Sequence, residues 1–194
     1  MANQEKIRKD RAFKSMLILG IFSIVMLFAG LTSAYIVSKG ALSSEGKWDV
    51  IVLPDEFQYS TIVIVLSSLF AIMSFQKLKK SDLVNTNRFL IIVLILGFIF
   101  SFFQFKGWAN LISEGHFFAG KGSNVAASFI YVLTGVHLAH LIAGLIVFLV
   151  LLYQLKLKKY TQKNYLGFQL GIWFWHFLGI LWIYLYAFLL YSTN

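Results

Sequence analysis

Hydrophobic residues along this chain gather into five long runs, and most of its charged residues lie between them. A helix needs roughly 20 apolar residues to cross the ~30 Å hydrocarbon core of a bilayer, and each run meets or approaches that length. The apolar residues follow one another without the alternation that marks strands of a membrane barrel. We therefore predict an all-α membrane protein, a five-transmembrane-helix bundle that forms a single transmembrane domain over 1–194. The predicted helices cover about 16–37, 59–75, 89–105, 125–153 and 168–191.

The composition narrows the class of protein further. Hydrophobic residues make up 59% of the 194 residues and charged residues 13%, whereas a soluble domain carries about 25% charged residues. A soluble chain of this length could not bury so much apolar surface in one core. The chain contains no cysteine, which excludes disulfides, iron–sulfur clusters and thiolate-bound zinc or copper within it.

The distribution of basic residues predicts how the bundle crosses the membrane. The N-terminal tail and the second and fourth loops hold thirteen of the 17 Lys and Arg residues, and the C-terminal tail holds none. Basic loops face the cytoplasm in most membrane proteins, so we expect a cytoplasmic N-terminus and an external C-terminus. The same segments explain the net charge of +9. They suit anionic lipid headgroups, and no nucleic-acid-binding motif is present, so no nucleic acid partner is predicted.

The apolar runs contain no Asp, Glu, Lys or Arg. Pumps and ion-coupled transporters place ionisable groups inside the bilayer, so this pattern argues against a transporter. The larger polar side chains within the runs are Gln104, His137, His140, Gln169 and His176.

The three histidines raise the possibility of a haem or metal site. His137 and His140 are three residues apart and share one helix face with Gly144, while His176 belongs to the last run. A small membrane cytochrome with a b-type haem between His176 and one of the other two is therefore an alternative function. At 1.5 Å per residue, His176 lies roughly 10–12 Å from the cytoplasmic end of its helix and His140 roughly 20 Å from that of its own. This mismatch favours imidazoles that hydrogen-bond between helices over metal ligands.

A second face of the fourth predicted helix carries small residues. Gly135, Ala139 and Ala143 follow one another at intervals of four, which lets helix backbones approach closely in lipid. The fifth helix is rich in aromatic residues, and Trp182 lies too deep to be an interfacial anchor, so it should pack against a partner. The fourth helix therefore needs neighbours on two sides, some of which another subunit could supply.

Several segments resemble one known family. Residues 134–144 (TGVHLAHLIAG) are similar to the "TGxHxxHxxxG" segment of haem–copper oxidase subunit III, and residues 174–186 (FWHFLGILWIYLY) resemble its last helix, "WHFxDxxWxxLY". Residues 96–104 (LGFIFSFFQ) are similar to its "LGxxFxxxQ", and residues 29–35 (AGLTSAY) resemble its "GGLFxAY". The four segments occur in family order along nearly the whole chain.

The resemblance implies a non-catalytic subunit III of a respiratory terminal oxidase, in the short five-helix bacterial form that lacks the first two of seven helices. It implies that the haems and copper lie on partner subunits, and that the cytochrome c oxidase complex reduces O2 to water while pumping protons. Subunit III would stabilise subunit I, support proton uptake and bind phospholipid. Subunit II, further subunits or a respiratory supercomplex are the other implied partners, and the bacterial cytoplasmic (inner) membrane is the implied location. A quinol oxidase of the same family is the alternative.

The resemblance also carries roles to individual positions, as packing or lipid contacts rather than as catalytic, cofactor or metal sites. These positions are Gln104, Gly135, His137, Ala139, His140, Ala143, Gly144, Trp175, His176 and Trp182.

Three positions depart from the family pattern. Many members have a glutamate where this chain has Ile24, an acidic residue at Gly179, and a glutamate at Gln169. The roles of those carboxylates do not transfer to this chain. The two helices that it lacks would also form one wall of the family's lipid cleft, and we expect helices of another subunit in their place.

Overall fold

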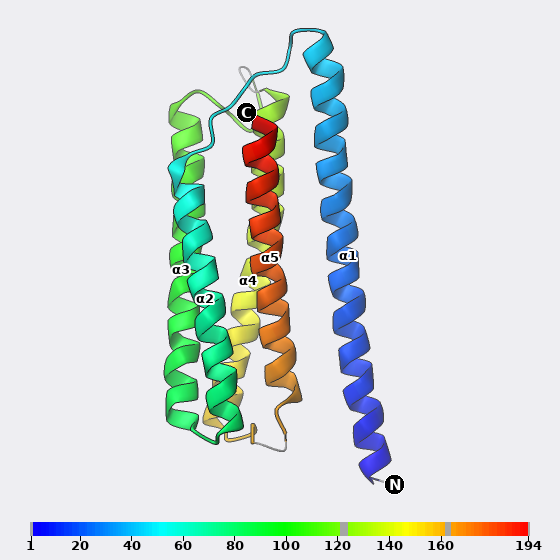
Figure 1. Ribbon diagram of the computed structural model, residues 1–194, viewed down its shortest axis with the longest axis vertical. Coiled ribbons are helices and arrows are strands. Elements are labelled where there is room, and N and C mark those ends of the chain that lie inside the picture. Colours follow the sequence, from blue (N-terminus) through cyan, green and yellow to red (C-terminus); the bar gives the residue numbers. More distant parts are fainter. Residues whose placement is uncertain (1, 121–123, 162–163, 194) are drawn as a thin grey trace.

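The computed structural model describes residues 2–120, 124–161 and 164–193, so Lys121 and Lys163 among the loop charges lie outside the described residues. Within these ranges the chain forms five helices, each long and apolar enough to span a membrane (Figure 1). They are α1 (Ala2–Ser44), α2 (Asp55–Lys79), α3 (Leu83–Ser113), α4 (Val125–Lys156) and α5 (Leu166–Thr193). The prediction of an all-α, five-helix membrane protein is confirmed.

The helices extend beyond the apolar runs that predicted them, mostly through polar and basic residues at their ends. The longest extension is at α1, which begins at Ala2 instead of about residue 16. Capping side chains define two of the starts: Asp82 accepts a hydrogen bond from the Asn85 amide before α3, and Asn124 accepts one from the Ala127 amide before α4. Such caps satisfy backbone N–H groups that have no partner within the helix.

The helices α2 to α5 form a compact bundle, and α1 lies along its side (Figure 1). Among the described helices α1 contacts only α4 and α5. Only 11% of its most apolar stretch is buried, against 28–44% in the other four helices. The contacts of α1 with α4 and α5 lie mainly in its second half. Phe28 packs against His140 of α4. Thr32 and Tyr35 contact Tyr184 and Phe188 of α5, in that order.

Close approach of the helices depends on glycines, three of which lie at contacts between α4 and its neighbours α3 and α5. A Cβ atom at Gly97 of α3 would lie 2.5 Å from the Leu145 side chain, one at Gly144 of α4 would lie 2.9 Å from Leu178, and one at Gly171 of α5 would lie 2.7 Å from a methyl carbon of Leu151. These distances leave no room for a larger side chain without movement. Lipid supplies no hydrophobic force between helices, so tight packing of this kind is what holds a membrane bundle together.

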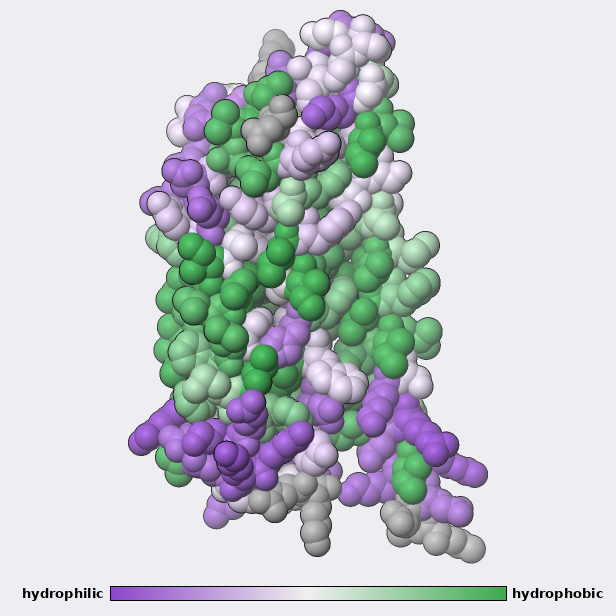
Figure 2. Space-filling model, in the orientation of Figure 1, coloured by the Kyte–Doolittle hydropathy of each residue, from purple (hydrophilic) through white to green (hydrophobic). Residues whose placement is uncertain are grey.

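Charge is divided unequally between the two ends of the bundle. Figure 2 shows a hydrophilic zone at the end where the N-terminus and the α2–α3 and α4–α5 loops lie, below a broad apolar band. We call this the basic end; its described basic residues include Lys77, Lys80, Arg88, Lys156 and Lys158. The C-terminus lies at the opposite end (Figure 1).

Candidate functional site

Two tryptophans of α5 connect the four helices of the bundle. Trp175 and Trp182 are two helical turns apart, and both are completely buried. The Trp175 indole N–H donates a hydrogen bond to the Ser67 hydroxyl of α2 at 3.0 Å, and its ring lies 4.9 Å from the Phe148 ring of α4. The same indole covers Gly97 of α3. One side chain of α5 therefore contacts α2, α3 and α4.

Trp182 repeats this arrangement nearer the opposite end. Its indole N–H donates to the Thr61 hydroxyl of α2 at 2.9 Å. Its ring lies 5.1 Å from that of Phe100 on α3 and 5.0 Å from that of His137 on α4. The packing partner expected for Trp182 is thus supplied by this chain itself.

Gln104 of α3 adds a further hydrogen bond between helices. Its side-chain amide donates to the Ser60 hydroxyl of α2 at 2.9 Å, and both side chains are fully buried. Ser60, Ser67 and Ser74 repeat every seven residues along the buried face of α2. Our reading of the sequence missed these serines, although their heptad spacing within an apolar run is a signal that could have found them.

His137 and His140 point in different directions despite their spacing of three. His137 is fully buried, with Nε2 3.1 Å from the Leu178 carbonyl of α5, so this nitrogen carries the proton and donates. His140 is half-buried with Nδ1 2.8 Å from the Val136 carbonyl of its own helix, and its ring lies against Phe28 of α1. Gly144 faces α5, as His137 does.

His176 lies on neither of these surfaces. It is half-buried in a groove between α2 and α5. The three imidazoles therefore face α5, α1 and the α2–α5 groove, which disfavours the alternative of a haem held between two of them. In the part of the chain that the structure describes, no three His, Asp or Glu side chains come close enough to hold a metal ion.

The small-residue face of α4 is only partly covered. The ring of Trp108 on α3 lies 3.8 Å from a Cβ built at Gly135, which is an ordinary contact. Ala139 and Ala143 are exposed. Contact of these two alanines with another subunit remains a prediction.

The three departures from the family pattern occupy ordinary packing positions. Ile24 is half-buried on α1 and packs against the apolar core. Gly179 leaves 3.2 Å between its would-be Cβ and the Ser68 hydroxyl of α2. Gln169 is half-buried in the second turn of α5.

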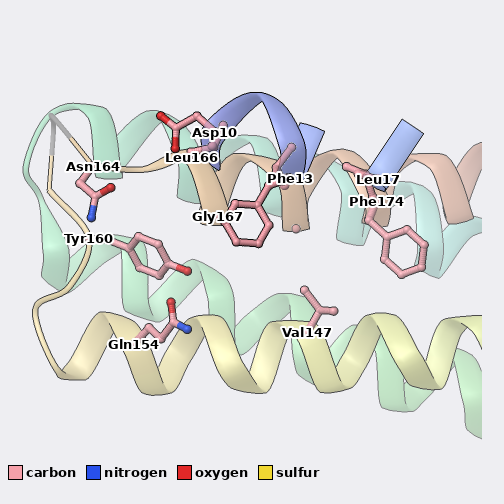
Figure 3. Close-up of a pocket in the computed structure, with 12 residues that line it drawn as sticks. Asp10, Phe13, Leu17, Val147, Gln154, Tyr160, Asn164, Leu166, Gly167 and Phe174 are labelled. Carbon is pink, nitrogen blue, oxygen red and sulfur yellow. The ribbon is translucent and has the colours of Figure 1, made fainter. Parts of the chain in front are cut away.

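A pocket of about 540 Å³ opens between α1, α4 and α5 at the basic end (Figure 3). Its walls are apolar and include Phe13, Leu17, Val147, Leu170 and Phe174. Its polar lining residues are Asp10, Gln154, Tyr160 and Asn164. The pocket exists because α1 contacts the bundle mainly through its second half, and it was not predicted from the sequence.

Two titratable groups in the loops of the basic end are perturbed. Hydrogen bonds from the Asn85 side chain and backbone lower the pKa of Asp82 below its ordinary value of 3.8, with help from Lys77, whose ammonium lies 3.6 Å away. Burial raises the pKa of the Tyr160 phenol at the pocket. Both shifts favour the form that prevails at neutral pH, a charged Asp82 and a neutral Tyr160.

Several known proteins are similar in sequence to most of this chain. A Nocardia farcinica protein described as a probable cytochrome c oxidase subunit 3 is 31% identical over 175 residues, covering 88% of this chain and 83% of the relative. The cytochrome c oxidase subunit 3 of Corynebacterium diphtheriae is 28% identical over 162 residues, covering 82% and 78%. A Mycobacterium leprae relative is 29% identical over 167 residues, covering 85% and 80%. The family model described as cytochrome c oxidase subunit III matches residues 3–194. The chain therefore belongs to the cytochrome c oxidase subunit III family.

Proposed function

We propose that this chain is a structural subunit that docks on subunit I of a cytochrome c oxidase and carries no step of the redox chemistry itself. The proposal rests on one observation, which is that side chains of the family motifs form hydrogen bonds within this chain. Gln104, His137, Trp175 and Trp182 each make one hydrogen bond to another helix of this chain. Such bonds stabilise a bundle in lipid and leave no set of side chains directed at a shared substrate position.

The family and the distribution of charge support further proposals about the membrane, the orientation and the partner subunits of this chain. We infer that the bundle spans the bacterial cytoplasmic membrane with its basic end, and hence its N-terminus, in the cytoplasm. The haems and copper would lie on subunits I and II, and further subunits or a supercomplex are compatible with the exposed apolar surface. The names of the relatives favour cytochrome c over quinol as the electron donor. Support of proton uptake by subunit I is proposed on the family resemblance alone.

We also propose that the pocket at the basic end holds an acyl chain of a phospholipid. Apolar residues from three helices line it, and its polar lining residues are Asp10, Gln154, Tyr160 and Asn164. Basic residues at the same end would attract an anionic headgroup. The pocket lies between α1 and the pair α4–α5. A bound lipid would therefore hold α1, the least buried helix, against the other two.

Co-purification from native membranes tests the structural role. The complex should contain this chain, subunit I and a haem spectrum, while the chain purified alone should be colourless. His137→Gln should leave the haem content of the assembled complex unchanged. A Soret band from the isolated chain would contradict the proposal and support the alternative of a small b-type cytochrome.

A pocket-filling substitution tests the lipid site. Leu170→Trp should lower the phospholipid that the purified chain retains, as measured by mass spectrometry, because the indole would occupy the acyl position. Leu149→Trp is the matched control, since Leu149 lies on the exposed surface of α4. Equal phospholipid in the two variants would count against the pocket as a lipid site.

A further inference from the structure

A second groove runs between α2 and α5 on the face shown in Figure 2, where a small hydrophilic spot interrupts the apolar band. Its volume is about 260 Å³. Its polar side chains are His176 of α5 and Ser68 of α2, and Gly179 forms part of its floor. The remaining lining residues are apolar, Ile64, Ile72 and Ile180 among them.

The groove lies deep in the membrane-spanning part of the bundle. His176 is eleven residues into α5, which places it about 15 Å from the start of that helix at 1.5 Å per residue. Ser68 is fourteen residues into α2 and lies about 20 Å from its start on the same scale. Both positions fall within the hydrocarbon core, where lipid headgroups and bulk water do not reach.

His176 has no hydrogen-bond, ionic or ring partner among the residues that the structure describes, in contrast to His137 and His140. An imidazole always has at least one N–H to donate and, when neutral, one lone pair to accept. A polar group without a partner is costly in hydrocarbon, and an acyl chain cannot supply that partner. A molecule that covers this groove must therefore bring a polar group to mid-membrane depth.

The shape of the groove favours a helix as that molecule. Gly179 is buried, and a Cβ there would lie 3.2 Å from the Ser68 hydroxyl, so α2 and α5 of this chain close the floor of the groove and a partner would contact the side chains at its rim. Ile180, which is 67% exposed, borders the groove and would contact the incoming helix. Because an acyl chain offers no hydrogen-bonding group to His176, hydrogen-bond complementarity argues for protein over lipid.

We propose that the α2–α5 groove receives a transmembrane helix of a partner oxidase subunit, which presents a hydroxyl or amide side chain to His176. This goes beyond the proposed function, because it assigns one surface and one polar contact to the docking that the function requires. It depends on the chain working within a complex, and it does not depend on the lipid pocket at the basic end.

Site-specific photo-cross-linking in the native membrane tests the surface. A photoreactive phenylalanine analogue at Ile180 should cross-link to a transmembrane helix of an oxidase subunit, within one helical turn of a Ser, Thr, Asn or Gln. The same analogue at Phe102 is the control, since that side chain is 64% exposed on α3, away from the groove. Lipid adducts alone from Ile180, or a cross-link to a second copy of this chain, would overturn the proposal.

Substitution of the histidine tests the polar contact. His176→Leu should lower co-purification of the cross-linked subunit about threefold to tenfold, the range expected for one hydrogen bond between membrane helices. His176→Asn, which keeps a donor and an acceptor, should restore most of it. Equal co-purification of the wild type and both variants would refute the role of His176. A complex that contains the oxidase subunits but never cross-links at Ile180 would refute the α2–α5 groove as the docking surface and leave the proposed function intact. A chain that never associates with oxidase subunits would refute both.

Discussion

Replacing one glycine inside the bundle should cost stability that the same replacement elsewhere does not. In Gly97→Ala the added Cβ would lie 2.5 Å from the Leu145 side chain and 3.0 Å from the Trp175 ring. Trp175 is held by its hydrogen bond to Ser67 and is completely buried, so it has little freedom to move. In Gly135→Ala the nearest atom, on the Trp108 ring, would be 3.8 Å away.

The paired design isolates the steric effect. Both replacements gain the same helix propensity, about 1 kcal/mol for Ala over Gly, so that gain cancels in the comparison. Overpacking of a tight core costs about 1–3 kcal/mol, and G97A should be less stable than G135A by that amount.

Unfolding of the purified full chain in mixed detergent micelles, followed by helical circular dichroism, measures this difference. Tryptophan fluorescence gives a second readout, because Trp175 borders the altered site. A G97A variant as stable as G135A would refute the view that Gly97 is required for close packing of α3 against α4 and α5.

Three further outcomes follow from the contacts described above. Trp175→Phe and Ser67→Ala should be non-additive, with a coupling energy of about 0.6–1.7 kcal/mol in a double-mutant cycle of unfolding, because they remove the same hydrogen bond. Ala139→Leu should leave the unfolding of the isolated chain unchanged, since that side chain is exposed, but should lower the yield of assembled oxidase; normal assembly would speak against an interface there. Because hydrogen bonds in the folded state lower the pKa of Asp82, its contribution to stability is complete above 3.8 and is lost as the pH falls below that value. Asp82→Asn should therefore destabilise the chain at neutral pH and progressively less in acid, and a pH-independent difference would disprove the assignment.

The apolar runs were sufficient to predict the number and type of the helices, because a helix needs about 20 predominantly nonpolar residues to cross the bilayer. Their ends were less predictable. The polar and basic residues before residue 16 still form helix in α1, since a helix can continue into water once its membrane part has formed. Hydropathy therefore identifies the spanning part of a helix and not its full length.

The orientation of side chains around each helix was the part that sequence alone could not supply. His137 and His140 occupy neighbouring positions on one helix face, yet one contacts α5 and the other α1. Which neighbour a side chain meets depends on how helices far apart in the sequence are arranged. The family resemblance drew attention to Trp175 and Trp182, but it could not indicate that serine and threonine residues of α2 accept their hydrogen bonds.

The isolation of α1 from α2 and α3 has a consequence for biogenesis. Among the described helices α1 contacts α4 and α5, although α2 and α3 are made before those two. During synthesis it must remain in the membrane without these partners while residues 45–124 are translated. A product that stops short of residue 125 would therefore leave α1 without either of the helices that it contacts in the folded chain.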